Sequence, residues 1–246
     1  MIKLLRADMI RMFRSRILHL MMLLFAGLFF LESAIATVDN VQEVENAFSS
    51  VIFGMGSVLL PMFVSIGICL IIGGEFTSGG IRNKITVGHK RESIYGSWLI
   101  CSLVITLAMT VVLVIASFAS ALVFGIDMSD TNAKATVINL LVMLVCDMGF
   151  TAIIVMFATL FTGVKSVAVA FIYNETTMMI FAMLGEVYNN SEVYKLLCRF
   201  FIQSQTKFYT TFQTTDTPWL TALCGASLGV VATIAGIVSF RRKDLK

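Results

Sequence analysis

The chain has 246 residues, of which 58% are hydrophobic and only 13% are charged, and its formal net charge is +3. A mean hydropathy of +0.90 excludes an ordinary soluble domain. We therefore expect a polytopic membrane protein, whose small positive charge reflects membrane orientation rather than affinity for nucleic acid. The five cysteines are widely spaced and odd in number, which predicts buried packing residues rather than disulfides or a metal site.

The first 16 residues predict an amphipathic helix on the membrane surface. One helical arc carries apolar residues: Ile2, Leu5, Met9, Met12 and Phe13. Basic residues occupy other arcs: Lys3, Arg11 and Arg14. A basic helix of this kind lies in the plane of the lipid headgroups. The segment either simply anchors the topology or forms a connecting helix that leads into the first span.

Six apolar runs follow, each with roughly the 20 residues that a bilayer requires. They cover residues 17–36, 48–72, 94–124, 136–161, 167–187 and 219–240. The fold class expected is an all-α polytopic membrane protein. One membrane domain over 1–246 contains six transmembrane helices, an N-terminal interfacial helix and a short cytosolic coupling helix.

The distribution of basic residues predicts the orientation. Fourteen of the 18 Lys and Arg residues lie within 1–16, 82–91 and 241–246 or at Lys165, all on one side of the predicted spans. The positive-inside rule assigns this side to the cytoplasm, so both termini are expected there.

A short charged segment over 73–93 separates two long apolar runs and is expected to form a cytosolic coupling loop. The glycines at 73–74 are predicted to end the second span, and those at 79–80 permit a sharp turn. In the short amphipathic element that follows, Ile81 and Ile85 share one face because they lie four residues apart. This pair is expected to form an apolar knob that fits a groove on a soluble partner.

The residues of this loop also form a diffuse motif: Glu75-Phe76, Gly80-Ile81-Arg82-Asn83-Lys84, Gly88 and Arg91-x-x-Ile94-Tyr95. The motif resembles the first intracellular loop of ABC-2-type transporter permeases, particularly small bacterial ones that export peptide antibiotics or give immunity to them. The resemblance implies a coupling helix that receives force from a separate ABC ATPase. It assigns this coupling to Glu75, Ile81, Arg82, Lys84, Ile85 and Arg91.

The same resemblance implies a bacterial plasma-membrane exporter in which a second permease subunit, identical or related, completes a dimer. ATP and Mg are expected on the partner ATPase, because Gly163-Val164-Lys165-Ser166 imitates only the tail of a phosphate loop. No catalytic, cofactor-binding or metal-binding residue is expected on this chain.

Spans one, two and five border the translocation route by the same resemblance, which places Pro61, Asn174 and Glu175 near it. Pro61 bends the second span, either as part of a pathway or as a structural kink. Glu175 lies within a run of five polar-capable residues, 173–177, which forms either a substrate path or interhelical hydrogen bonds. Asp147 is a second acidic residue near the middle of a span.

Two further segments carry packing signals. The outer segment 186–218 has apolar residues at helical spacing and Ser191 as a candidate N-cap, which predicts one or two short interfacial helices. In the sixth span, Gly225 and Gly229 permit close approach of another helix, either within the chain or between subunits.

These observations together predict the permease subunit of an ATP-driven exporter that moves an amphipathic peptide or a hydrophobic drug. An ion- or proton-coupled secondary transporter or channel, using Glu175 and Asp147, is the first alternative. A membrane scaffold without transport activity is the second.

Overall fold

The computed structural model describes residues 2–38, 47–126, 133–188, 191–200 and 218–243. Every regular element in these ranges is a helix, as expected. In chain order they are α1 Ile2–Phe13, α2 Arg16–Val38, α3 Ala47–Thr77, α4 Gly80–Thr86, α5 Arg91–Phe124, α6 Ala133–Leu160, α7 Val164–Tyr188, α8 Glu192–Phe200 and α10 Pro218–Arg242.

Six of these helices, α2, α3, α5, α6, α7 and α10, are long and apolar enough to cross a membrane. This confirms the six predicted spans and the expectation of a multi-pass membrane protein. Hydropathy locates such helices well because a segment in hydrocarbon must satisfy its own backbone hydrogen bonds.

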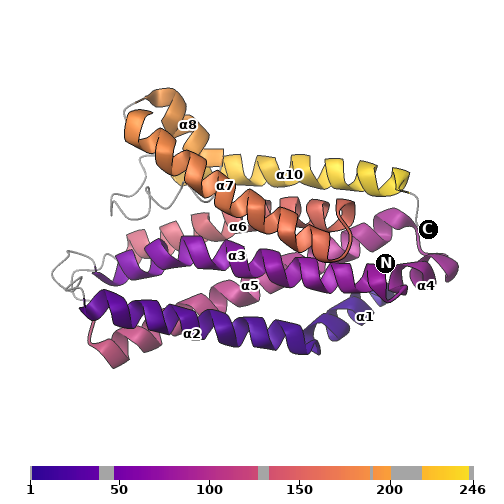
Figure 1. Ribbon diagram of the computed structural model, residues 1–246, viewed down its shortest axis with the longest axis horizontal. Coiled ribbons are helices and arrows are strands. Elements are labelled where there is room, and N and C mark those ends of the chain that lie inside the picture. The colour runs from indigo at the N-terminus through magenta and orange to yellow at the C-terminus, as the bar shows by residue number, and fades with distance from the viewer. Residues whose placement is uncertain (1, 39–46, 127–132, 189–190, 201–217, 244–246) are drawn as a thin grey trace.

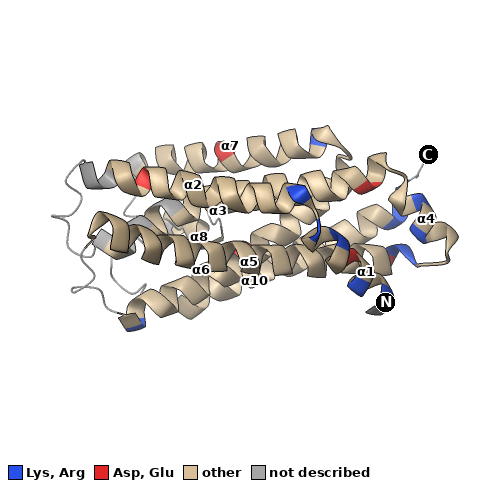
Figure 2. Ribbon diagram, turned by 90° about the horizontal axis from the view of Figure 1, so that it is seen from below, with Lys and Arg blue, Asp and Glu red and all other residues tan. Residues whose placement is uncertain are grey.

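Helix α3 lies at the centre of an elongated bundle (Figure 1). It contacts α2, α5, α6 and α7. In the most apolar part of each span, 71% of the α3 residues are buried, against 22% in α2 and in α7, so α2 and α7 lie on the outside. Both chain ends lie at the end of the bundle that carries α4, which we call the α4 end (Figure 1). Lys and Arg residues gather there around α1 and α4 (Figure 2).

The glycines at 73–74 were expected to end the second span, but α3 continues through them to Thr77. A Cβ atom at Gly73 would lie 3.2 Å from the Cα atom of Gly163, so this glycine allows the turn between α6 and α7 to approach α3. The sharp turn follows at Gly79, whose φ of 71° lies in the left-handed region.

Helices α6 and α10 pack with their backbones in contact. A Cβ atom at Gly149 would collide with the carbonyl oxygen of Gly225, and one at Gly229 would lie 2.9 Å from the Cα atom of Gly149. The small residues of the sixth span therefore serve packing within the chain.

Helix α8 begins directly after Ser191, and the remainder of the predicted outer segment, 201–217, lies outside the described residues. The Tyr194 hydroxyl donates to the carbonyl oxygen of Phe181 at 2.9 Å and fixes α8 to α7. The apolar residues Val193, Leu196 and Leu197 are exposed. This exposed apolar face suits a helix that lies at a membrane surface.

Candidate functional site

Two buried carboxylates lie at the α4 end of the bundle. Asp8 of α1 is 3% exposed, and Glu75 of α3 is 4% exposed. Carboxylates so deeply buried are costly unless cations and hydrogen-bond donors surround them. The contacts of these two residues therefore define the site.

Lys84 of α4 lies between the two carboxylates. Its Nζ atom is 2.8 Å from Oδ1 of Asp8 and 2.7 Å from Oε2 of Glu75. Burial lowers the pKa of Lys84, and the hydrogen bond to Asp8 opposes this change. One ammonium group thus joins α4 to both α1 and α3.

Arg11 provides the second cation, and two neutral donors complete the network. Arg11 pairs with Glu75 through Nη2, which also lies 3.8 Å from Oδ1 of Asp8. Trp98 Nε1 donates to Oε2 of Glu75 at 3.0 Å, and Ser97 Oγ donates to Oδ2 of Asp8 at 2.6 Å. Two acids and two bases therefore balance in charge and connect α1, α3, α4 and α5.

Aromatic rings support this ion-pair network from the side of α10. The ring of Trp98 lies 5.8 Å from that of Phe76 and 5.4 Å from that of Phe240, and Lys84 Nζ lies 5.5 Å from the Trp98 ring. Trp98 thus contributes both an N–H donor and a packed aromatic surface. The two carboxylates are buried, and Arg11 is the half-exposed member of the network.

The orientation of α4 differs from the predicted apolar knob. Ile81 is only 2% exposed and Ile85 is partly buried, and both pack against the core of this chain. Lys84 shares their face of the helix, so its ion pairs fix the rotation of α4. The outward surface consists instead of polar residues and one apolar residue: Arg82, Asn83, Thr86 and Val87.

Arg91, the remaining predicted coupling residue, joins helix ends within the chain. Its Nη1 atom donates to the carbonyl oxygens of Arg241 at 2.9 Å and Lys243 at 2.6 Å. Lys243 Nζ in turn donates to the carbonyl oxygens of Thr159 at 2.5 Å and Leu160 at 2.9 Å. These cations satisfy carbonyl groups at the C-terminal ends of α10 and α6.

The polar run of α7 is divided between two faces. Asn174 is 2% exposed and faces the bundle, whereas Glu175 is exposed. Asn174 Nδ2 donates to Oε1 of Glu175 at 3.3 Å.

Helix α3 contacts α7 near the start of α7. Cys69 Sγ of α3 donates to the carbonyl oxygen of Ser166 on α7 at 3.5 Å. Pro61 is also buried, inside α3.

Asp147 lies in the interior of the bundle and is only 1% exposed. Neither of its carboxylate oxygens has a hydrogen-bond partner within the described ranges. One turn further along α6, the hydroxyl of Thr151 lies 2.7 Å from that of Thr106 on α5. Thr110, one turn further along α5 than Thr106, is also buried, and its hydroxyl donates to the carbonyl oxygen of Thr106 at 3.0 Å.

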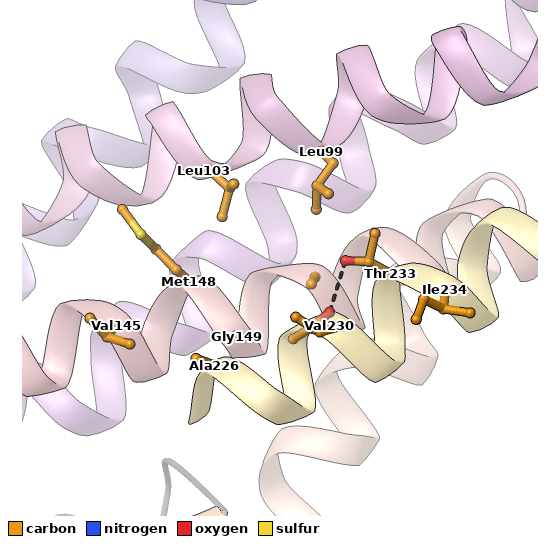
Figure 3. A pocket seen from close by; sticks show the side chains of 11 residues that line it. Leu99, Leu103, Val145, Met148, Gly149, Ala226, Val230, Thr233 and Ile234 are labelled. Carbon is orange, nitrogen blue, oxygen red and sulfur yellow. Dashed lines mark hydrogen bonds between the residues drawn. The ribbon is translucent and has the colours of Figure 1, made fainter. Parts of the chain in front are cut away.

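A pocket of about 360 Å³ lies among α5, α6 and α10 (Figure 3). Its walls are apolar, with Leu99, Leu103 and Val230 among the lining residues. The hydroxyl of Thr233, which also lines it, donates to the carbonyl oxygen of Gly229 at 2.8 Å. Such a surface suits hydrocarbon and gives a polar substrate no anchoring group.

Asp8, Ser97 and Trp98 belong to the site, although the sequence motifs do not include them. One sequence feature points to the site: Asp8 is the sole acidic residue among the first 31 residues. It shares a helical face with Leu4 and Met12, and this face is buried in the structure, whereas Phe13 of the predicted apolar arc is exposed.

No protein-family model matches the sequence, and a search of curated proteins gives no match. The assignment of a function thus depends on the residues and their geometry.

Proposed function

We propose that this chain is the permease subunit of an ATP-driven exporter of the ABC-2 type, which moves an amphipathic peptide or a hydrophobic drug out of a bacterial cell or its plasma membrane. ATP hydrolysis takes place on a separate ABC ATPase. The α4 end faces the cytoplasm, in agreement with the concentration of Lys and Arg around it.

The observation that supports this proposal most directly is the attachment of α4. A seven-residue helix has little stability alone, yet Lys84 ties this one to carboxylates of both α1 and α3. A push on the outward face of α4 would therefore reach α1 and α3 together. This is the arrangement expected of an element that transmits force from a soluble partner.

The outward face of α4 is the surface that we assign to ATPase docking. The double variant Arg82→Glu/Val87→Asp reverses one charge and adds another. It should abolish recovery of the ATPase with the tagged permease, because it places two carboxylates in the interface. The ATPase is identified by its phosphate-loop sequence after purification from native membranes. Wild-type protein that never recovers such an ATPase would contradict the proposed function.

Arg242→Glu provides the matched control for this experiment. Arg242 is exposed at the same end of the bundle but belongs to α10. This variant should retain the partner at wild-type yield, and both variants should insert and fold normally. Equal loss in both variants would show that general charge at this end, rather than α4, holds the ATPase.

The exposed face of α7 is assigned to the second permease subunit and the translocation route. Glu175 is exposed in the middle of this span beside apolar residues that are also exposed, such as Ile172 at 61% and Met179 at 60%. An ionisable side chain facing lipid is costly, so protein or a hydrated route is the more favourable neighbour. The proposed dimer supplies both.

Replacing Glu175 by glutamine tests this assignment. If Glu175 borders a hydrated route, Glu175→Gln should alter substrate-stimulated turnover or substrate preference, while stability in detergent stays close to that of wild type. A purely structural acid would behave differently: Glu175→Gln would transport normally, and Glu175→Ala would lose interhelical hydrogen bonding worth about 0.6–2 kcal/mol. Stability and transport measurements on both variants distinguish the two roles.

Ion- or proton-coupled transport is the second candidate function, and buried Asp147 is the observation that favours it. Purified protein in vesicles should then transport in response to an ion gradient without any ATPase. Our first proposal predicts no such transport.

A further inference from the structure

A second pocket, of about 220 Å³, lies at the α4 end between the turn from α1 to α2 and the last turns of α3. It lies at the membrane boundary, because the apolar stretches of α2 and α3 that are long enough to span a membrane have their ends there, at Arg16 and Thr77. Its lining residues are of two kinds. Arg11, Ser15, Glu75 and Ser78 form a polar part, whereas Ile17, Leu70 and Ile71 belong to apolar runs of the spans.

The polar part contains a cation with unused donors. The Arg11 side chain is 50% exposed, and its ion pair with Glu75 uses the Nη2 group. Within the described part of the chain, Nε and Nη1 of Arg11 make no hydrogen bond. The exposed residues Arg14 and Arg16 flank the lining residue Ser15 in sequence and add positive charge to this segment.

We propose that this pocket binds an anionic phospholipid of the adjacent leaflet, with its phosphate at Arg11 and one acyl chain along Ile17 and Leu70. Arginine is suited to phosphate because its planar guanidinium group presents several donors. Basic pockets and basic amphipathic helices at the cytoplasmic membrane surface attract anionic lipids. The occupant is a lipid rather than soluble phosphate because the apolar part of the pocket continues into the spans.

Arg11 also pairs with Glu75, which lines the same pocket, so its guanidinium group would lie between the lipid phosphate and that carboxylate. The lipid would thus contact the link between α1 and α3. This inference requires a membrane protein but does not rest on the proposed transport function.

The structure provides a variant that fills the pocket. Gly74 lies in α3 and lines the pocket, and a Cβ atom built on it meets no other atom within 4 Å. Gly74→Leu should therefore occupy the cavity without a backbone clash. Gly27→Leu on α2 is the matched control, because Gly27 is also helical, exposed and free of Cβ contacts but lies outside the pocket.

Binding is measured by native mass spectrometry of the purified protein in detergent, with phosphatidylglycerol as the probe. Wild-type protein should bind it about tenfold more tightly than a diacylglycerol with the same chains. Gly74→Leu should weaken this binding by about tenfold, whereas Gly27→Leu should stay within about twofold of wild type. Ser78→Phe provides a second filling variant if Gly74→Leu fails to fold, as judged by its melting temperature.

Three results would overturn the inference. Unchanged binding in a folded filling variant would place the lipid elsewhere. Equal affinity for diacylglycerol would show that the site recognises hydrocarbon only. Equal affinity for glycerol phosphate would show that it binds a soluble phosphate compound and not a membrane lipid.

Discussion

Replacing Glu75 by glutamine is expected to lower the free energy of unfolding by about 3 kcal/mol, the lower end of the range for removing one partner from a buried ion pair. The amide leaves Lys84 and Arg11 with Asp8 as their remaining carboxylate. The loss falls at the lower end because Arg11 is half exposed and can regain water. The midpoint of unfolding in mixed detergent micelles measures this change.

Glu92→Gln is the control for this prediction. Glu92 pairs with Arg241 at the same end of the bundle, but the two side chains are 48% and 55% exposed. An exposed pair contributes only about 0–1 kcal/mol. Equal losses for Glu75→Gln and Glu92→Gln would show that burial adds nothing to the network.

A double variant tests whether the network acts as a unit. Glu75→Gln combined with Lys84→Met restores the charge balance between Asp8 and Arg11. Its loss of stability should be smaller than the sum of the two single losses, because the two residues are in direct contact. Additive losses would mean that each residue acts through other neighbours.

Introducing a single methyl group at Gly149 is expected to separate α6 from α10. The Cβ atom of Gly149→Ala would collide with the backbone of Gly225, and backbone atoms cannot rotate out of its way. Overpacking of this kind costs about 1–3 kcal/mol. Thermal unfolding in detergent should show a clearly lower midpoint for this variant.

Gly67→Ala is the matched substitution for Gly149→Ala. Gly67 lies inside α3, where an added Cβ atom meets nothing within 4 Å. Alanine there should leave the unfolding midpoint unchanged or raise it, since alanine is the better helix former. A similar decrease in both variants would attribute the effect to glycine itself rather than to the contact between helices.

The spans could be predicted from the sequence, but the side of each helix that is buried in the bundle could not. A bilayer demands long apolar runs, and these specify the six helices almost to their ends. In lipid, however, the outside of a helix is as apolar as its inside, so hydropathy does not distinguish them. Asp147 and Glu175 are both acids near the middle of spans, yet one is buried and the other exposed.

The site shows a related limit of sequence analysis. Periodicity correctly groups Ile81 with Ile85, but it does not say whether their shared face meets this chain or a partner. For α1, hydrophobicity predicts an arc that leaves out Asp8, whereas the buried face includes Asp8, which is stable there because Lys84 and Ser97 reach it. Lys84 and Ser97 lie far along the chain, and their proximity to Asp8 depends on the tertiary fold.

The contact between α6 and α10 also constrains how the protein can be assembled during synthesis. Helix α6 enters the membrane before α7 and α8, but the partner of its glycine face is α10, which is made after both. Until α10 is made, Gly149 must face lipid, another helix or the insertion machinery. The carbonyl groups of Thr159 and Leu160 likewise lack the hydrogen bonds from Lys243 until then. Closure of the bundle is therefore a late event, and nascent chains that end before α10 should expose a glycine-lined face that other membrane helices can bind.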